Sequence, residues 1–255
     1  MRGLKVFKEK FSDYREHYVV IGGTACYILF NELDLDFRAT KDIDMVVLME
    51  EINHDFADAF WEFIDDGKYQ EVAQGSMHKN FYRFTKPKNP DYPAMIELFS
   101  RKPEGLELKI DAHTMPIHID DDISSLSAIL LNDDYYELLR TQKKVIDGIS
   151  ILNEIALIPF KIKAFLEIKD RQQKDIAEQN ASHDLKKHRR DIFRLARIIP
   201  PTERIFLSTD IKNDMQEFIS IIRDEEVDLS QLGWKGDNAK DEFINLIEEV
   251  YQLKN

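Results

Sequence analysis

The chain of 255 residues contains a single cysteine, Cys26, and this scarcity limits what can hold the fold together. One cysteine cannot form an internal disulfide, so the small disulfide-rich classes of secreted domain are excluded. A lone thiol among Ala25, Tyr27 and Ile28 is typical of a small core residue. The low cysteine content also indicates a reducing compartment, and we expect a cytoplasmic protein.

Long hydrophobic runs are missing as well. A membrane-spanning helix needs about 18 or more consecutive apolar residues, and no stretch of the chain approaches that length. The N-terminal sequence MRGLKVFKEKFSDYREHY has no apolar segment of the kind found in a signal peptide. We therefore expect no membrane partner. Hydrophobic residues still make up 43% of the chain, which is enough to form a packed core.

The chain has fewer basic than acidic residues. It contains 35 Lys and Arg and 48 Asp and Glu, and its formal net charge is −13. This balance argues against a general nucleic-acid coat. Residues 160–197 differ, with eleven Lys or Arg and six Asp or Glu. That stretch fits either a solvated helix surface or a local docking site for a polyanion such as RNA.

The hydrophobic pattern changes near residue 153. Helices are expected before it over residues 4–18, 24–33 and 52–66, and strands over residues 18–21, 43–49, 69–73, 80–85, 94–100, 106–112 and 115–119. After it the pattern is helical, over residues 155–179, 182–199, 201–224 and 238–253, with Pro200 and Pro201 expected to end one helix and start the next. We predict an α+β protein with a mixed sheet and flanking helices in residues 1–153, and a helical domain in residues 154–255 packed against it.

Two acids, Asp42 and Asp44, lie at the start of an expected buried strand, IDMVVLM. Alternate residues of a strand point to the same face, and the two Cα atoms should lie about 6.6 Å apart. Carboxylates this close repel one another unless a proton or a cation intervenes. Oxygen ligands suit Mg²⁺ or Mn²⁺, and His113, His118, His183 and His188 do not have the spacing of a zinc site.

A pair of metal ions would need a further acid from a neighbouring strand. Two apolar-flanked candidates follow, Glu97 in AMIELFS and Asp111 in LKIDAH. Upstream, Gly22, Gly23 and Thr24 stand between an expected strand and an expected helix. Glycines at such a turn allow a ligand to approach the backbone, and the N-terminus of the following helix favours a phosphate group.

These features together resemble the nucleotidyltransferase superfamily with the DNA polymerase β-like core. The stretch GGTACYILFNELDLDFRATKDIDM is similar to the AbiEii/AbiGii toxin family, with Arg38 and Thr40 matching the residues that precede the two acids. PFKIKAFLEIKDR and KKHRRDIFRL resemble two later motifs of that family. Lys161 best matches the motif lysine, with Lys163 second, and Asp191 best matches the later acid, with Asp184 second.

The resemblance implies a nucleotidyltransferase-type core and a metal-dependent transfer of a nucleoside monophosphate from an NTP to an acceptor hydroxyl. Asp42, Asp44 and Glu97 would bind Mg²⁺ or Mn²⁺, and Lys161 and Asp191 would act in catalysis, with Lys161 reaching the triphosphate. Gly22, Gly23, Thr24, Arg38 and Thr40 would bind the nucleotide. RNA such as tRNA is the implied acceptor, and an antitoxin protein the implied partner.

Two kinds of alternative remain open from the sequence. The acceptor hydroxyl could belong to a small molecule or to a protein. The chain could also be a catalytically silent module that kept the fold and binds RNA or a protein through its basic helices.

Overall fold

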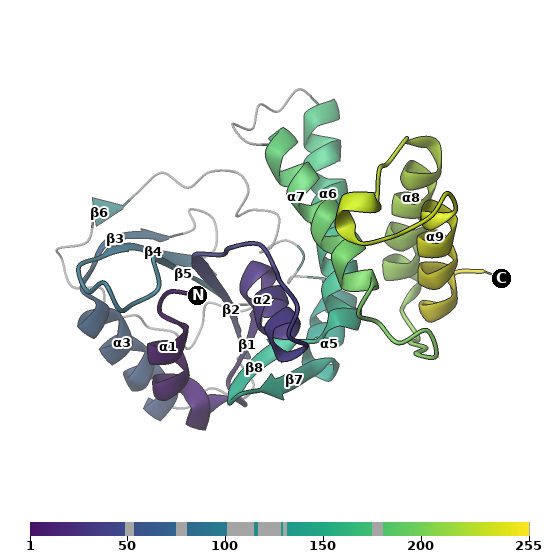
Figure 1. Cartoon of the computed structure of the whole chain (residues 1–255). Coiled ribbons are helices and arrows are strands. Elements are labelled where there is room, and N and C mark those ends of the chain that lie inside the picture. Colours follow the sequence, from purple (N-terminus) through teal and green to yellow (C-terminus); the bar gives the residue numbers. More distant parts are fainter. Residues whose placement is uncertain are drawn as a thin grey trace. The chain divides into compact units, whose positions relative to one another are not determined.

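The structure is a computed structural model that describes residues 1–48, 54–74, 81–100, 115–116, 129, 132–174 and 181–254 (Figure 1). The chain divides into two compact units. The first comprises Met1–Leu131 and Leu139–Asn153, and the second comprises Asn132–Leu138 and Glu154–Asn255. Among the described residues, no helix is long and apolar enough to cross a membrane.

The first unit is built on an eight-stranded mixed sheet in the order β6-β3-β4-β5-β2-β1-β8-β7. The strands are β1 (Tyr18–Ile21), β2 (Asp42–Val47), β3 (Tyr69–Gln74), β4 (Phe81–Pro87), β5 (Met95–Ser100), β6 (Met115–Pro116), β7 (Lys143–Ile146) and β8 (Ile149–Leu152). The pairs β1/β8, β2/β5 and β3/β6 are parallel, and the other neighbours are antiparallel. The predicted α+β class with a mixed sheet is thus confirmed. The strand expected over residues 106–112 lies outside the described residues.

Burial along the strands explains their sequences. Every residue of β1 and β8 is buried, so β1 reads as a short continuous apolar run, whereas β8 contains the buried polar residue Ser150 between apolar residues. In β5 the pattern alternates, with Ile96 and Leu98 buried and Glu97 half-buried. At the level of Asp44 and Glu97, the sheet therefore has one apolar face and one face that carries acidic side chains.

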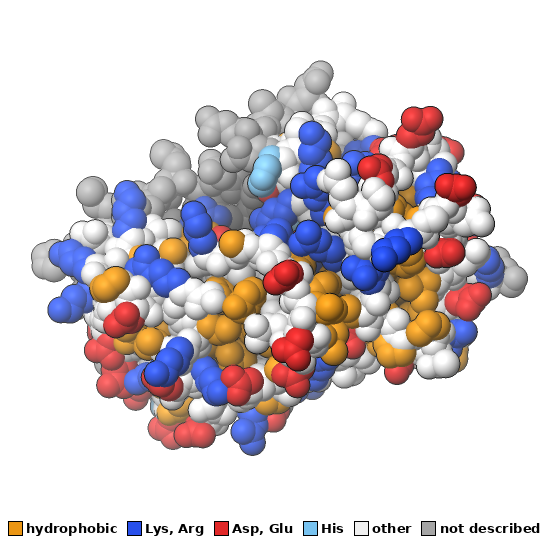
Figure 2. Space-filling view, viewed as in Figure 1, with side chains coloured by type: hydrophobic (Ala, Val, Ile, Leu, Met, Phe, Trp, Pro, Cys, Tyr) orange, Lys and Arg blue, Asp and Glu red, His pale blue; other side chains and the backbone are white. Residues whose placement is uncertain are grey.

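Among the described residues, the helices that lie wholly in this unit are α1 (Leu4–Phe11), α2 (Gly22–Glu32) and α3 (His54–Gly67). Helix α1 buries Phe7 and Phe11, whose rings lie 6.0 and 5.2 Å from the ring of Phe63 on α3. The exposed side of α3 is acidic, and acidic side chains gather over α3 in Figure 2. The predicted helix over residues 4–18 was too long, because the chain passes through a 3-10 turn, η1 (Ser12–Tyr14), into β1.

The hairpin formed by β7 and β8 was not predicted. Its turn is Asp147-Gly148, and both residues have positive φ angles, 49° and 79°. Such angles belong to the tight turn that matches the twist of a hairpin, and Asp-Gly is a favoured sequence for it. The hairpin completes one edge of the sheet next to β1.

The second unit is helical, with α6 (Glu154–Gln173), α7 (Ala181–Ala196), α8 (Thr209–Asp224), η2 (Ser230–Leu232) and α9 (Ala239–Val250), while α5 (Asp133–Thr141) spans the division between the units. Ring contacts hold the helices together, for example Phe165 to Phe218 at 5.3 Å and Phe193 to Phe243 at 4.6 Å. The prediction that Pro201 starts a helix is wrong. Helix α8 begins at Thr209, where the Ser208 hydroxyl accepts a hydrogen bond from the backbone N–H of Ile211.

A proline inside α6 is compensated by a side chain from the end of the chain. Pro159 has no N–H to donate to the carbonyl of Ile155, four residues earlier in the helix. The hydroxyl of Tyr251 donates to that carbonyl at 2.7 Å. Tyr251 is fully buried, and burial raises the pKa of its hydroxyl well above the usual range. The hydroxyl therefore stays protonated and keeps the carbonyl satisfied.

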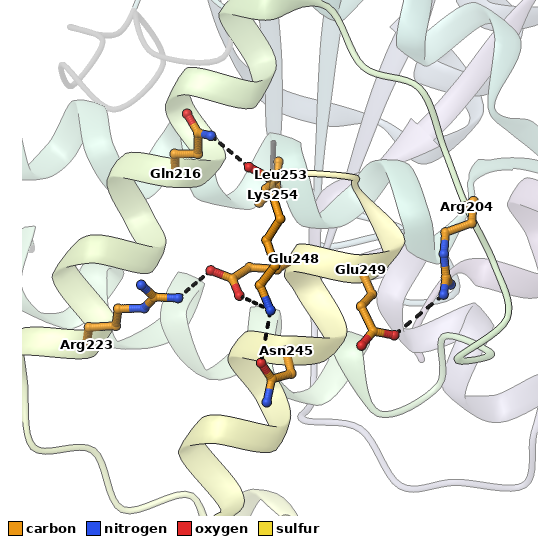
Figure 3. A network of polar contacts seen from close by, with 8 residues as sticks. All are labelled: Arg204, Gln216, Arg223, Asn245, Glu248, Glu249, Leu253 and Lys254. Atoms are coloured by element: carbon orange, nitrogen blue, oxygen red, sulfur yellow. Dashed lines mark hydrogen bonds and ion pairs between the residues drawn. The ribbon is translucent and has the colours of Figure 1, made fainter.

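The C-terminal residues are fixed by a polar network on α8 and α9 (Figure 3). Glu248, whose side chain is nearly buried, binds both Arg223 of α8 and Lys254, with Lys254 Nζ 2.9 Å from Glu248 Oε2. The Gln216 amide donates to the carbonyl of Leu253 at 3.0 Å. The last turn of the chain thus belongs to the packed part of the helical unit.

We expect Tyr251→Phe to lower the free energy of unfolding by about 1–3 kcal/mol, because the carbonyl of Ile155 would be left buried without that donor. Urea denaturation followed by circular dichroism measures the change. Tyr27→Phe is the matched control, because the Tyr27 hydroxyl is half-buried and accepts a hydrogen bond from the N-terminal ammonium at 3.1 Å. Equal losses in the two variants would contradict the role given to Tyr251.

Candidate active site

The polar face of the sheet brings together side chains that are far apart in sequence. Asp44 of β2 and Glu97 of β5 are direct partners on neighbouring parallel strands. Glu97 is in turn the direct partner of Arg83 on the antiparallel strand β4. Directly paired residues point to the same face of a sheet, so Asp44, Glu97 and Arg83 form one row across three strands.

Asp42 and Asp44 share this face, as the strand spacing predicted. Both are half-buried, whereas the intervening Ile43 and the following Met45 are completely buried on the other face. Two adjacent carboxylates are therefore held at the border between the core and the solvent. Oxygen groups in this setting can bind a divalent cation.

The glycine pair begins α2 and lies directly against these acids. Gly22 has a φ of +66°, and a Cβ atom at this position would lie 2.0 Å from Oδ2 of Asp44. Glycine is needed there both for the left-handed backbone conformation and for the close approach of the carboxylate. The N-terminus of α2 and the carboxylate of Asp44 consequently meet at one point.

Arg38 and Thr40, in the segment between α2 and β2, reach the same helix end. A Cβ atom on Gly23 would lie 3.1 Å from Thr40 Oγ1 and 3.2 Å from Arg38 Nη2. The backbone of the second glycine is thus covered by a hydroxyl and a guanidinium. Such groups, with the N–H groups of a first helical turn, can hold a phosphate.

Thr24 has a different position from the one expected for a phosphate ligand. Its side chain is completely buried, and its hydroxyl donates to the carbonyl of Asp42. This bond ties the first turn of α2 to the start of β2. A direct contact between the Thr24 hydroxyl and phosphate stays a prediction.

Glu97 is held by an arginine that the sequence reasoning did not identify. Arg83 Nε and Nη2 each lie 2.6 Å from Oε1 of Glu97. Within the described part of the chain, no three His, Cys, Asp or Glu side chains are arranged to hold a metal ion. Asp111, the other candidate for the third acid, lies outside the described residues.

Lys161 and Asp191, which belong to the second unit, are brought together by α6 and α7. Lys161 Nζ lies 2.9 Å from Asp191 Oδ2, and the side chains are only 5% and 1% exposed. A buried ion pair of this kind fixes the contact between two helices. The catalytic roles expected of the two residues stay predictions.

The second choices for these motif positions have partners of their own. Lys163 binds Asp214 at 3.0 Å, and the hydroxyl of the buried Tyr135 donates to the same carboxylate at 2.9 Å. Burial and the neighbouring Asp214 raise the pKa of Tyr135, so this hydroxyl keeps its proton. The carboxylate of Asp184 has partners on its own helix, α7, with Lys187 Nζ 4.0 Å and His183 Nδ1 3.5 Å away.

Comparison with family models gives no match for this sequence, and no curated protein matches it. Among solved structures, the fold is similar to that of an antigenic nucleotidyltransferase-like protein from Paracoccidioides brasiliensis. The two chains are 15% identical, the TM-score is 0.46, and the alignment covers 90% of this chain and 89% of that chain. The chemistry of the site is therefore read from the side chains described above.

We expect Gly22→Ala to destabilise the protein more than Gly236→Ala. Both glycines have positive φ angles, and a side chain in that conformation costs about 1–2 kcal/mol. An added methyl group at Gly236 meets nothing within 4 Å, whereas one at Gly22 would collide with Asp44. Denaturation of both variants measures the difference, and equal losses would show that the Asp44 carboxylate moves aside at no cost.

We expect Lys161→Met to lower the free energy of unfolding by about 3–5 kcal/mol, because it leaves the carboxylate of Asp191 buried without this partner. The double variant Lys161→Met/Asp191→Leu should recover most of the loss, since both charges are removed. Lys174→Met is the control, because the exposed pair of Lys174 with Asp170 should contribute no more than about 0.5 kcal/mol. A double variant less stable than the single one would show that the pair is not the cause.

Proposed function

We propose that this protein is a nucleotidyltransferase that transfers a nucleoside monophosphate from an NTP to an acceptor hydroxyl. The observation that carries the proposal is the meeting of the Asp44 carboxylate with the glycine-initiated N-terminus of α2. A phosphate group at this helix end would lie beside the two carboxylates of β2. Phosphoryl transfer consists mostly of positioning and charge neutralisation, and this arrangement offers both.

Asp42 and Asp44 fit a divalent cation such as Mg²⁺ or Mn²⁺. They supply hard oxygen ligands, share one face of β2, and are half-buried at the edge of the core. A bound cation would neutralise negative charge on the phosphates and on the departing pyrophosphate. The protein's own part is to hold both carboxylates in place through the buried residues Ile43 and Met45.

The groups at the start of α2 would bind the phosphates of the NTP. The guanidinium of Arg38 lies next to the backbone of Gly23 and can form charge-assisted hydrogen bonds to a phosphate oxygen. Thr40 offers a hydroxyl at the same place. Thr24 keeps this helix end in register with β2 through its bond to Asp42.

RNA such as tRNA is the acceptor that we propose, in a toxin-like protein with an antitoxin partner. Helix α7 supports a polyanion as acceptor, because Lys186 and Arg190 are one helical turn apart and both exposed. Exposed cations spaced along one helix face can contact successive phosphates. A small molecule or a protein hydroxyl would require no such face.

A second candidate function is that of a silent nucleotidyltransferase-fold module that binds RNA or a protein. The pairing of Glu97 with Arg83 favours it, because the third acid is already neutralised by a side chain. The two functions differ in a direct test. Incubation with radiolabelled NTPs, Mg²⁺ and total tRNA transfers label to the RNA only if the protein is an enzyme.

We expect Asp44→Asn to reduce this transfer by about 100-fold or more, since it removes a charged group at the reacting centre. Its stability should be unchanged or slightly higher, because the repulsion from Asp42 is relieved. Asp36→Asn is the matched control, since Asp36 is exposed and precedes the same strand. Near-normal transfer by Asp44→Asn would overturn the role of the two strand acids. No transfer by the unaltered protein to tRNA, to protein or to a pool of small-molecule acceptors would favour the silent module.

A further inference from the structure

The contact between Arg83 and Glu97 sets the number of cations that the proposed site can take. The inference drawn from it rests on the proposed function. Asp42, Asp44 and Glu97 share one face of neighbouring strands, so their spacing alone would suit a site for two metal ions. The arrangement of the side chains differs from that expectation, because the carboxylate of Glu97 is bound to the guanidinium of Arg83.

The geometry of this pair is that of a strong contact. Two nitrogen atoms of Arg83, Nε and Nη2, lie 2.6 Å from one oxygen of Glu97. The Arg83 side chain is 24% exposed and the Glu97 side chain 12%, so both are largely shielded from solvent. Charge-assisted hydrogen bonds in such surroundings are stronger than those at an open surface.

The strand register keeps the guanidinium in place. Arg83 and Glu97 are direct partners on β4 and β5, and the neighbouring Tyr82, Phe84, Ile96 and Leu98 are buried on the opposite face. The backbone on both sides of the pair is therefore anchored in the core.

We propose that Arg83 is a positioning residue that holds Glu97 away from the cation site, and that the site binds one divalent cation, on Asp42 and Asp44. Glu97 then serves as the partner that orients Arg83 and is not a metal ligand. The pair also removes one negative charge from a face where three carboxylates would otherwise repel one another. This assignment replaces the predicted role of Glu97 in metal binding.

Binding of Mn²⁺ to the full chain tests the assignment without any need for activity. Electron paramagnetic resonance of free Mn²⁺, with the protein in the micromolar range, gives the number of ions bound. We expect one ion for the unaltered protein. Glu97→Gln should still bind one ion. The double variant Arg83→Met/Glu97→Gln, which removes both charges of the pair, should bind it with unchanged affinity, whereas loss of a residue that supports a metal ion costs about 10–100-fold in affinity.

Substitutions of Arg83 should change the number of Mn²⁺ ions that the protein binds. Arg83→Met releases the carboxylate of Glu97, and we expect a second Mn²⁺ to bind. Arg83→Lys keeps a positive charge beside Glu97 and should bind one ion, as should the double variant Arg83→Met/Glu97→Gln. Arg2→Met is the control, because Arg2 is exposed and donates to the carbonyl of Asn89 at 3.2 Å. Circular dichroism confirms that each variant is folded.

Three results would overturn the assignment: two ions bound by the unaltered protein, a tenfold or greater loss of affinity in Arg83→Met/Glu97→Gln, or one ion in a folded Arg83→Met. The result for the double variant decides even if Arg83→Met does not fold. Absence of Mn²⁺ binding would overturn both this assignment and the metal-dependent function. One bound ion together with no transfer of label would count against the proposed function alone.

Discussion

The close approach between the start of α2 and the start of β2 is the contact on which the candidate site depends. It exists because Gly22 has no side chain where the Asp44 carboxylate lies, and because its φ of +66° turns the chain from β1 directly into the helix. The buried hydroxyl of Thr24 fixes the same junction by donating to the carbonyl of Asp42. Backbone N–H groups, two carboxylates and the guanidinium of Arg38 are therefore held within one small volume by main-chain geometry.

Local patterns in the sequence predicted the parts of this junction but not the neighbours across the sheet. The spacing of Asp42 and Asp44 is a property of a single strand, so alternation alone placed both acids on one face. The partner of Glu97 depends on which strand lies beside β5 and in which register. That pairing is a long-range property, and Arg83 could not be connected with Glu97 from the sequence.

Two errors in the fold predicted from the sequence have local causes. The hairpin of β7 and β8 carried a readable signal, Asp147-Gly148, between two short apolar runs, and it was missed because these runs precede the long helical part. The start of α8 was placed too early because Ile205, Phe206 and Leu207 continue the apolar pattern. The capping residue Ser208 is the better signal, since its side chain satisfies a backbone N–H of the first turn.

In the helical unit, two residues of the family-like motifs meet in one buried ion pair. Lys161 and Asp191 were selected as separate catalytic candidates, and the structure joins them across 30 residues in one buried pair. Helical spacing predicted which residues face inward on α6 and α7 but not that two opposite charges would meet there. Because the two opposite charges bind each other, a lysine and an aspartate can both be buried between these helices.

The ion pairs Lys161–Asp191 and Arg83–Glu97 differ in how far they are shielded from solvent. The pair of Lys161 with Asp191 is almost completely shielded, so an exchange of either partner for a ligand would leave a charge in the core. The pair of Arg83 with Glu97 is anchored by its strands but borders the solvent on the same face as Asp44. The second pair therefore lies where its charges can influence an anion or a cation bound beside Asp44. On this face of the sheet, the guanidinium of Arg83 neutralises the carboxylate of Glu97, so less negative charge is left next to Asp42 and Asp44.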